Sequence, residues 1–213
     1  MLDFLMSEQV LRFDLAVFEA VSKIWNPVLD VIMKTITYMG EAGIIWILLA
    51  IVLFLTKKYR KAGVAIAVAL IVMEILNNVV LKNAIARPRP CWEDNELLAS
   101  LGWWFESYEF PYVVGKPHSY SFPSGHTSSA FAASVAFLWY DRKYGIPTVI
   151  FAAIMGFTRL YVHVHYCTDI IGGVIVGVIY ALIGVGITTL IFKFLGKYID
   201  KVPAVIKSKK EAK

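Results

Sequence analysis

Residues 168–192 read TDIIGGVIVGVIYALIGVGITTLIF, and Asp169 is the only charged side chain in this run. The hydrocarbon core of a bilayer is about 30 Å thick, and roughly 17–25 apolar residues of helix are needed to cross it. The run is therefore long enough for one membrane-spanning helix. Three further stretches meet this requirement: Ala62–Leu81, Ser124–Tyr140 and Ile146–Val162. A fifth stretch, Gly43–Thr56, is short by itself and is expected to take Tyr38–Ala42 as its first turn.

The composition agrees with a chain that lies mostly in lipid. Hydrophobic residues make up 58% of the 213 residues, charged residues make up 17%, and the mean hydropathy is +0.64. Soluble domains have roughly 45–50% apolar and about 25% charged residues. The net charge of +5 is not accompanied by a basic face with interleaved aromatics, so nucleic acid is not an expected partner. We predict an all-α, polytopic membrane helical bundle with five core spans.

The distribution of basic residues predicts how the bundle is oriented. Lys and Arg favour cytoplasmic loops. The Lys57–Lys61 loop, the Asp141–Gly145 turn and the C-terminal tail are basic, and they share one side if five helices alternate in direction. The connections Arg89–Pro123 and Tyr161–Cys167 then lie on the extracytoplasmic side. We therefore expect a multi-pass protein of the cell membrane with a cytoplasmic C-terminus.

The first forty residues are amphipathic. Val10–Ile24 and Val28–Tyr38 carry apolar residues at helical spacing, but charged residues are interspersed among them. A charge at the centre of a membrane helix costs about 2.5–3.5 kcal/mol on insertion scales. Two helices in the outer interface are therefore expected, and a kinked sixth span is the alternative. The expected organisation is N-terminal amphipathic helices over 1–40, a membrane core over 41–196 and a basic cytoplasmic tail over 197–213.

Three polar segments, residues 82–90, 121–126 and 158–169, fall at the outer ends of hydrophobic helices. Lys82, Arg89 and Arg159 supply three cations without matching carboxylates nearby in the sequence, and such groups bind phosphate oxygens. Ser124 and Gly125 open a helix, where backbone N–H groups favour an anion. Ser124 is expected either to cap this helix or to donate its hydroxyl to the anion. The segments predict a site for a phosphate-sized anion.

Two histidines and a carboxylate in these segments can carry chemistry. One helical turn separates His165 from Asp169, so the carboxylate can hold the imidazole Nδ1–H and leave Nε2 as a nucleophile. His126, on another helix, can protonate a leaving oxygen and later deprotonate a water. The sequence has no acidic cluster that would hold a metal ion, and we expect neither a metal nor a cofactor.

The order and spacing of these residues resemble a known signature. Its parts here are Lys82 followed by six residues and Arg89-Pro90, then Pro123-Ser124-Gly125-His126, and then Arg159 with His165 and Asp169. The pattern is similar to that of the type 2 phosphatidic acid phosphatase family, which shares its motif with vanadium haloperoxidases. The resemblance implies hydrolysis through a phosphohistidine at His165, with Asp169 orienting the imidazole and His126 as acid and base. It gives phosphate-binding roles to Lys82, Arg89, Ser124, Gly125 and Arg159.

Two further positions, Thr158 and Arg87, lie near residues of the signature. Thr158 stands where the family usually has serine, which leaves a hydroxyl beside Arg159. Arg87 lies outside the signature spacing and is expected to contact lipid headgroups.

The expected function is that of a metal-independent lipid phosphatase acting on a phosphate monoester or diphosphate lipid. The candidate substrates are undecaprenyl diphosphate, phosphatidic acid and phosphatidylglycerophosphate, and the resemblance to short bacterial members favours the first. A lipid or anion transporter that uses the same cationic site without hydrolysis is the alternative, and a vanadate-dependent haloperoxidase is a third interpretation.

Two groups of residues near the expected site have open roles. Cys91 and Cys167 are candidates for a disulfide on an oxidising outer face. The aromatic residues of the outer connection are expected to form either an interfacial belt or a lid beside the site. They are Trp92, Trp103, Trp104, Tyr108 and Tyr112.

Overall fold

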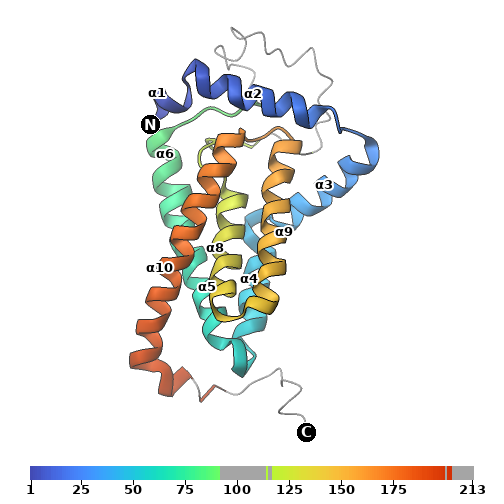
Figure 1. Ribbon diagram of the computed structural model, residues 1–213. Coiled ribbons are helices and arrows are strands. Elements are labelled where there is room, and N and C mark those ends of the chain that lie inside the picture. The colour runs from blue at the N-terminus through green and yellow to red at the C-terminus, as the bar shows by residue number, and fades with distance from the viewer. Residues whose placement is uncertain (92–113, 115–116, 200, 203–213) are drawn as a thin grey trace.

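The computed structural model in Figure 1 describes residues 1–91, 114, 117–199 and 201–202, and all elements in these ranges are helices. The N-terminal helices are α1 (Leu2–Leu5), α2 (Glu8–Ser22), α3 (Pro27–Met39), η1 (Glu41–Gly43) and α4 (Ile44–Phe54). The next hydrophobic segment contains η2 (Lys57–Tyr59), α5 (Arg60–Met73), the π-helix η3 (Glu74–Leu81) and α6 (Lys82–Ile85). The remaining helices are α8 (Gly125–Tyr140), α9 (Arg142–Tyr161) and α10 (Cys167–Ile199).

Three helical segments are long and apolar enough to cross a membrane, namely Lys57–Ile85, Arg142–Tyr161 and Cys167–Ile199. A fourth would be added if Pro27–Met39 and Glu41–Phe54, which are bent by 46° relative to one another, formed one broken span. The helix α8 has 16 residues, fewer than the other candidates. The all-helical architecture is thus confirmed, and the count of five spans stays a prediction.

The helix α8 packs against α5, α9 and α10, and small residues allow this close approach. A Cβ atom added to Gly177 of α10 would lie 2.8 Å from the carbonyl oxygen of Ser128. One added to Gly184 would lie 2.7 Å from the carbonyl oxygen of Ala65 in α5. Small residues give helices close contact where lipid supplies no hydrophobic drive for association. At one end of the bundle, this packing brings the Ser124 amide within 3.2 Å of the carbonyl oxygen of Asp169.

Two expected boundaries differ in the structure. Tyr38–Ala42 does not form the first turn of the next helix: α3 ends at Met39, and α4 begins at Ile44. Ala42 and Gly43 have φ values of 50° and 70°, which end a right-handed helix. Residues 141–145 are not a turn, because Asp141 caps α9 by accepting a 3.1 Å hydrogen bond from the Tyr144 amide.

The helix α2 lies across the end of the bundle, above α9 and α10 (Figure 1). Its residues Leu11, Leu15 and Phe18 pack against Leu160 and Tyr166, so its apolar face contacts protein. The helix α2 therefore covers the end of the bundle where the polar segments meet. The expected division at residues 40 and 196 remains a prediction, and residues 203–213 of the expected tail lie outside the described residues.

Candidate active site

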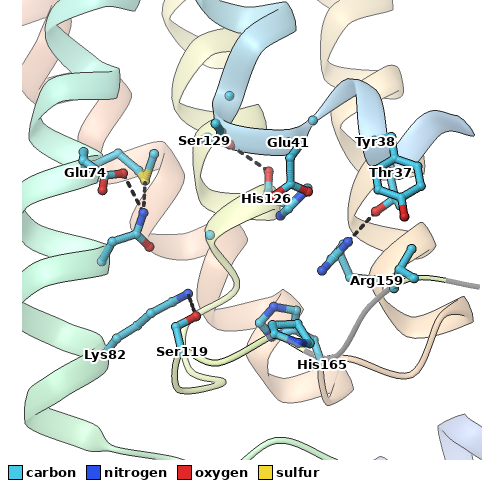
Figure 2. Close-up of a pocket in the computed structure, with 18 of the residues that line it drawn as sticks. Thr37, Tyr38, Glu41, Glu74, Lys82, Ser119, His126, Ser129, Arg159 and His165 are labelled. Atoms are coloured by element: carbon cyan, nitrogen blue, oxygen red, sulfur yellow. Dashed lines mark hydrogen bonds and ion pairs between the residues drawn. The ribbon is translucent and has the colours of Figure 1, made fainter. Parts of the chain in front are cut away.

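A cavity of about 610 Å³ opens at this end of the bundle (Figure 2). Its walls come from the end of α3 and its connection to α4, from η3 and α6, from the start of α8 and the end of α9, and from connecting segments that carry Arg89, Ser119 and His165. Six of the eight expected site residues line it: Lys82, Arg89, Gly125, His126, Arg159 and His165. Ser124 and Asp169 lie behind the wall with no exposed surface. Segments far apart in the sequence are thus brought to one cavity.

The imidazole of His165 is held at both ring nitrogens. Its Nε2 lies 3.0 Å from Nη1 of Arg89, and its Nδ1 lies 3.3 Å from Oδ2 of Asp169. A guanidinium can only donate hydrogen bonds, so Nε2 must accept and the proton belongs on Nδ1, facing the carboxylate. This tautomer places the lone pair of Nε2 beside the cation that is expected to bind phosphate.

Burial favours the neutral imidazole at this position. Burial is the largest influence lowering the pKa of His165, and the nearby charges of Arg89, Arg159 and Lys82 lower it further. The pKa therefore lies well below the usual value of 6.5, and the ring is unprotonated at neutral pH. An unprotonated imidazole keeps a lone pair on Nε2, which a nucleophile needs.

Asp169 is surrounded by donors. Its Oδ2 accepts hydrogen bonds from the Ser121 hydroxyl and, at 2.9 Å, from the Tyr166 amide. Its Oδ1 accepts one of 2.6 Å from Nη1 of Arg87. These bonds fix the carboxylate in one orientation toward His165.

The expectation that Arg87 contacts lipid headgroups is wrong. Arg87 has no exposed surface and forms ion pairs with Asp169 at 2.6 Å and with Asp14 of α2 at 2.9 Å. Its guanidinium also lies 3.9 Å from the centre of the Tyr166 ring. A buried guanidinium is tolerated when carboxylates and hydrogen-bond acceptors compensate its charge. Part of that compensation comes from Asp14 of α2, a helix that sequence spacing did not connect to the site.

Lys82 and Arg159 point into the cavity from separate elements, as Figure 2 shows, and Arg89 also lines it. Lys82 lies with its Nζ 3.5 Å from the Ser119 hydroxyl, and Arg159 donates a 2.5 Å hydrogen bond to the Thr37 hydroxyl. Arg89 donates to the carbonyl oxygen of Ser119 at 2.6 Å. Thr37 of α3 and Ser119 were not identified from the sequence, because single hydroxyl residues carry no spacing signal.

The start of α8 completes the cavity. Ser124 caps this helix, since its hydroxyl lies 3.5 Å from the Thr127 amide and accepts a 3.0 Å hydrogen bond from the Thr127 hydroxyl. Of the two roles open to Ser124, the structure therefore has the cap. A Cβ atom on Gly125 would lie 3.1 Å from Oδ1 of Asn78 and 3.6 Å from Nζ of Lys82. Glycine thus keeps the space beside the lysine open.

His126 lies in the first turn of α8, beneath the connection between α3 and α4. Its Nε2 has no hydrogen-bond partner among the described residues and lies 3.7 Å from the Glu41 carboxylate. Thr158, beside Arg159, donates its hydroxyl to the Met155 carbonyl oxygen of its own helix at 2.7 Å. The hydroxyl retained at this position therefore supports α9 rather than the cavity.

We expect Gly40→Ala to lower kcat about tenfold, because small displacements of His126, the expected acid–base group, are costly. A Cβ atom on Gly40 would lie 2.6 Å from Sδ of Met155 and 3.0 Å from Cδ2 of His126, so Met155 must shift and the imidazole must give by a few tenths of an ångström. The φ value of −86° at Gly40 permits alanine, which removes backbone strain as an explanation.

Gly186→Ala is the matched control, because a Cβ atom there has no atom within 4 Å. Steady-state phosphate release by the two variants is the measurement. Equal activity in both would show that the contact with Gly40 does not position His126.

The expectations for the two cysteines and for the aromatic residues of the outer connection have different outcomes. No disulfide joins Cys91 to Cys167 in the structure. The aromatic residues of the outer connection, from Trp92 to Tyr112, lie outside the described residues.

Comparison with known proteins shows the family of the chain. The model of the PAP2 superfamily matches residues 58–193. The chain is 31% identical to undecaprenyl-diphosphatase BcrC of Bacillus subtilis over 85% of this chain and 86% of that protein. It is 29% identical to phosphatidylglycerophosphatase B of the same organism, over 86% of this chain and 87% of the relative.

A solved structure shares the fold. The crystal structure of a transmembrane PAP2 type phosphatidylglycerolphosphate phosphatase from Bacillus subtilis superposes with a TM-score of 0.67 and 25% identity. The match covers 91% of this chain and 92% of that one. The chain belongs to the PAP2 superfamily. It is a membrane protein and a phosphatase, as the resemblance in its signature implied.

Proposed function

We propose that the protein hydrolyses a phosphate monoester or diphosphate lipid through a phosphohistidine at His165. The observation that carries the proposal is the placement of His165. Its Nε2 lies at the wall of a cavity with three cations, and its Nδ1 faces Asp169. In such a cavity, charge that develops on phosphate oxygens is met by fixed cations and by the N–H groups at the start of α8.

In the first step, the lone pair of Nε2 forms a bond to phosphorus while the bond to the lipid oxygen breaks. The leaving oxygen keeps the electron pair and takes a proton from His126. In the second step, water attacks the phosphorus, His126 accepts a proton from that water, and the P–N bond breaks. The electron pair returns to Nε2, phosphate leaves, and the imidazole is neutral again. Lys82, Arg89 and Arg159 bind the phosphoryl oxygens in both steps.

An apolar groove beside the cavity supports a lipid substrate. The groove has a volume of about 840 Å³ and runs between α4 and α5. It shares wall residues with the polar cavity at the bend between α3 and α4 and at the start of η3, namely Ala42, Gly43, Met73, Glu74 and Asn78. A lipid with its phosphate in the cavity would have a path for its tail along the groove.

The relatives support a choice among substrates. Undecaprenyl diphosphate is the first candidate, because the relative at 31% identity is named an undecaprenyl-diphosphatase. Phosphatidylglycerophosphate is the second candidate, because the relative at 29% identity is named phosphatidylglycerophosphatase B. Phosphatidic acid remains a further candidate. The diphosphate and the monoesters place the same terminal phosphoryl group at Nε2, so the chemistry above applies to each.

We also propose a membrane topology of five core spans, with the cavity on the extracytoplasmic side and the C-terminus in the cytoplasm. The Lys57–Tyr59 segment and Arg142 lie at helix ends away from the cavity, and the positive-inside rule assigns such ends to the cytoplasm. In this arrangement residues 1–40 cover the outer end, 41–196 form the core and 197–213 form a basic tail. The C-terminal end of α10 lies at the opposite end of the bundle from α2 (Figure 1).

Ala67→Phe tests whether the groove holds a lipid tail. Ala67 lines the groove and is exposed within it, so a phenyl ring there obstructs the path. Because a blocked tail misplaces the phosphate, we expect kcat/KM for a long-chain lipid phosphate to fall at least about tenfold. Hydrolysis of a short water-soluble aryl phosphate should be unchanged. Ala153→Phe, at an exposed position of α9 outside the groove, is the control. An equal loss on both substrates would contradict the tail path.

A further inference from the structure

The helix α2 brings a buried carboxylate to the back of the candidate active site. Asp14 has no exposed surface, although it lies on the face of α2 that carries Leu11 and Phe18. Its Oδ2 accepts a 2.9 Å hydrogen bond from Nη2 of Arg87 and one of 2.8 Å from the Thr168 hydroxyl. Its Oδ1 accepts one of 2.9 Å from the Thr168 amide. All of these donors lie outside the N-terminal region.

Arg87 connects this carboxylate to the one that faces His165. Its Nη2 donates to Asp14 and to the Leu5 carbonyl oxygen at 2.9 Å, while its Nη1 donates to Asp169 at 2.6 Å. The Thr168 hydroxyl joins both, since it accepts from Nη1 of Arg87 at 2.7 Å and donates to Asp14. The result is a buried chain of ionic hydrogen bonds from α2 to Asp169.

We propose that Asp14 is a positioning residue for the phosphatase reaction, acting through Arg87 on Asp169. The inference rests on the proposed role of His165 as nucleophile. Asp14 fixes the Arg87 guanidinium on Oδ1 of Asp169, which leaves Oδ2 to the imidazole, the Ser121 hydroxyl and the Tyr166 amide. It also holds the first turn of α10 through the Thr168 amide, one residue before Asp169. An N-terminal helix outside the family signature thereby becomes part of the reaction site.

The charge of this chain matters when the phosphoenzyme forms. A phosphoryl group on Nε2, with the proton kept on Nδ1, gives the imidazole a positive charge. Asp14 and Asp169 together outnumber Arg87 by one negative charge, so the buried chain as a whole stabilises that positive ring. Neutralising Asp14 removes the excess negative charge. The positive charge of Arg87 then compensates the whole negative charge of Asp169. Charge placed near the reacting group in a water-poor site has a large effect on rate.

Asp14→Asn is the direct test, measured as steady-state phosphate release and as the single-turnover rate of phosphoenzyme formation. We expect kcat and the phosphorylation rate to fall about 10- to 100-fold, as for other groups that orient a reacting ligand. KM and the affinity for inorganic phosphate should change less than about threefold, because Asp14 does not line the cavity. Thr168→Val keeps the amide contact and removes one hydroxyl, so kcat should fall about 3- to 10-fold.

Val21→Ala is the matched control. Val21 lies two turns further along α2, on the same side, and is buried against Tyr161 and Val162. It should lower the melting temperature while leaving kcat unchanged. If Asp14→Asn and Thr168→Val fold and retain wild-type kcat, or lose no more than Val21→Ala, the inference is overturned.

His165→Ala, assayed in parallel, separates this inference from the proposed function. Phosphate release that persists in His165→Ala would overturn the nucleophile and the inference together. An inactive His165→Ala beside a fully active Asp14→Asn would overturn the positioning role of Asp14 alone. Loss of kcat in both variants, with KM unchanged in Asp14→Asn, would support both.

Discussion

His165→Ala is expected to lower phosphate release by about 10⁴-fold or more, as removal of a covalent nucleophile does in other hydrolases. The cavity keeps its three cations, because Lys82 contacts Ser119, Arg159 contacts Thr37, and Arg89 is held by the Ser119 carbonyl oxygen as well as by the imidazole. Substrate should therefore still bind, and the loss should fall on kcat. Initial rates with a lipid phosphate in detergent micelles, together with the affinity for inorganic phosphate, measure the two effects.

The control for this variant is its stability. His165 is buried, and its replacement leaves Arg89 and Asp169 without one partner. A thermal unfolding curve in detergent must show a cooperative transition, so that the loss of rate is not a loss of fold. Turnover within about tenfold of wild type, where loss of a nucleophile costs far more, would reject His165 as the nucleophile.

His126→Gln is expected to lower kcat about 10²- to 10⁴-fold on a lipid phosphate, the usual contribution of a general acid–base group. The defect should depend on the leaving group. An alkoxide leaving group needs a proton, whereas a nitrophenolate leaves without one, so the phosphorylation step should be nearly normal with a nitrophenyl phosphate. The dephosphorylation step still lacks its base. A burst of nitrophenolate, equal in amount to enzyme and followed by slow turnover, is the predicted result.

The outcome opposed to this prediction is an equal loss with both leaving groups and no burst. Ser129→Ala, one turn further along α8, is a suitable control, because its hydroxyl bonds only the His126 carbonyl oxygen, at 3.1 Å, among the contacts described. That variant tests whether disturbing the start of α8 is itself sufficient to slow the reaction. We expect it to retain most of the activity.

The convergence of Lys82, Arg89, His126, Arg159 and His165 could be predicted from the sequence. Each residue follows or precedes a long apolar run, and alternating helices return such ends to the same side. That Arg87 supports Asp169 while Arg89 lines the cavity could not be predicted, because this difference depends on which groups lie behind Asp169. The two arginines are only two residues apart, and spacing alone selects one of them.

A signal for Asp14 was nevertheless present. Leu11, Asp14 and Phe18 are spaced by three and four residues, which places the carboxylate on the apolar face of α2. A charged residue on such a face indicates a buried partner. The bend between α3 and α4 had a similar signal in Gly40 and Gly43, which bracket the break. The contact between this bend and His126 could not be predicted, because no local sequence pattern shows which side chain lies beneath a bend.

The most direct test of the account is the position of the phosphoryl group on the enzyme during turnover. The wild-type protein and His126→Gln are mixed with a substrate carrying a labelled terminal phosphate, quenched in alkali, where phosphohistidine survives, and digested for mass spectrometry. The label should be found on His165, be lost in mild acid, and accumulate to a higher level in His126→Gln. A label on another residue, or phosphate release through water with no labelled enzyme under any condition, would contradict the phosphohistidine mechanism.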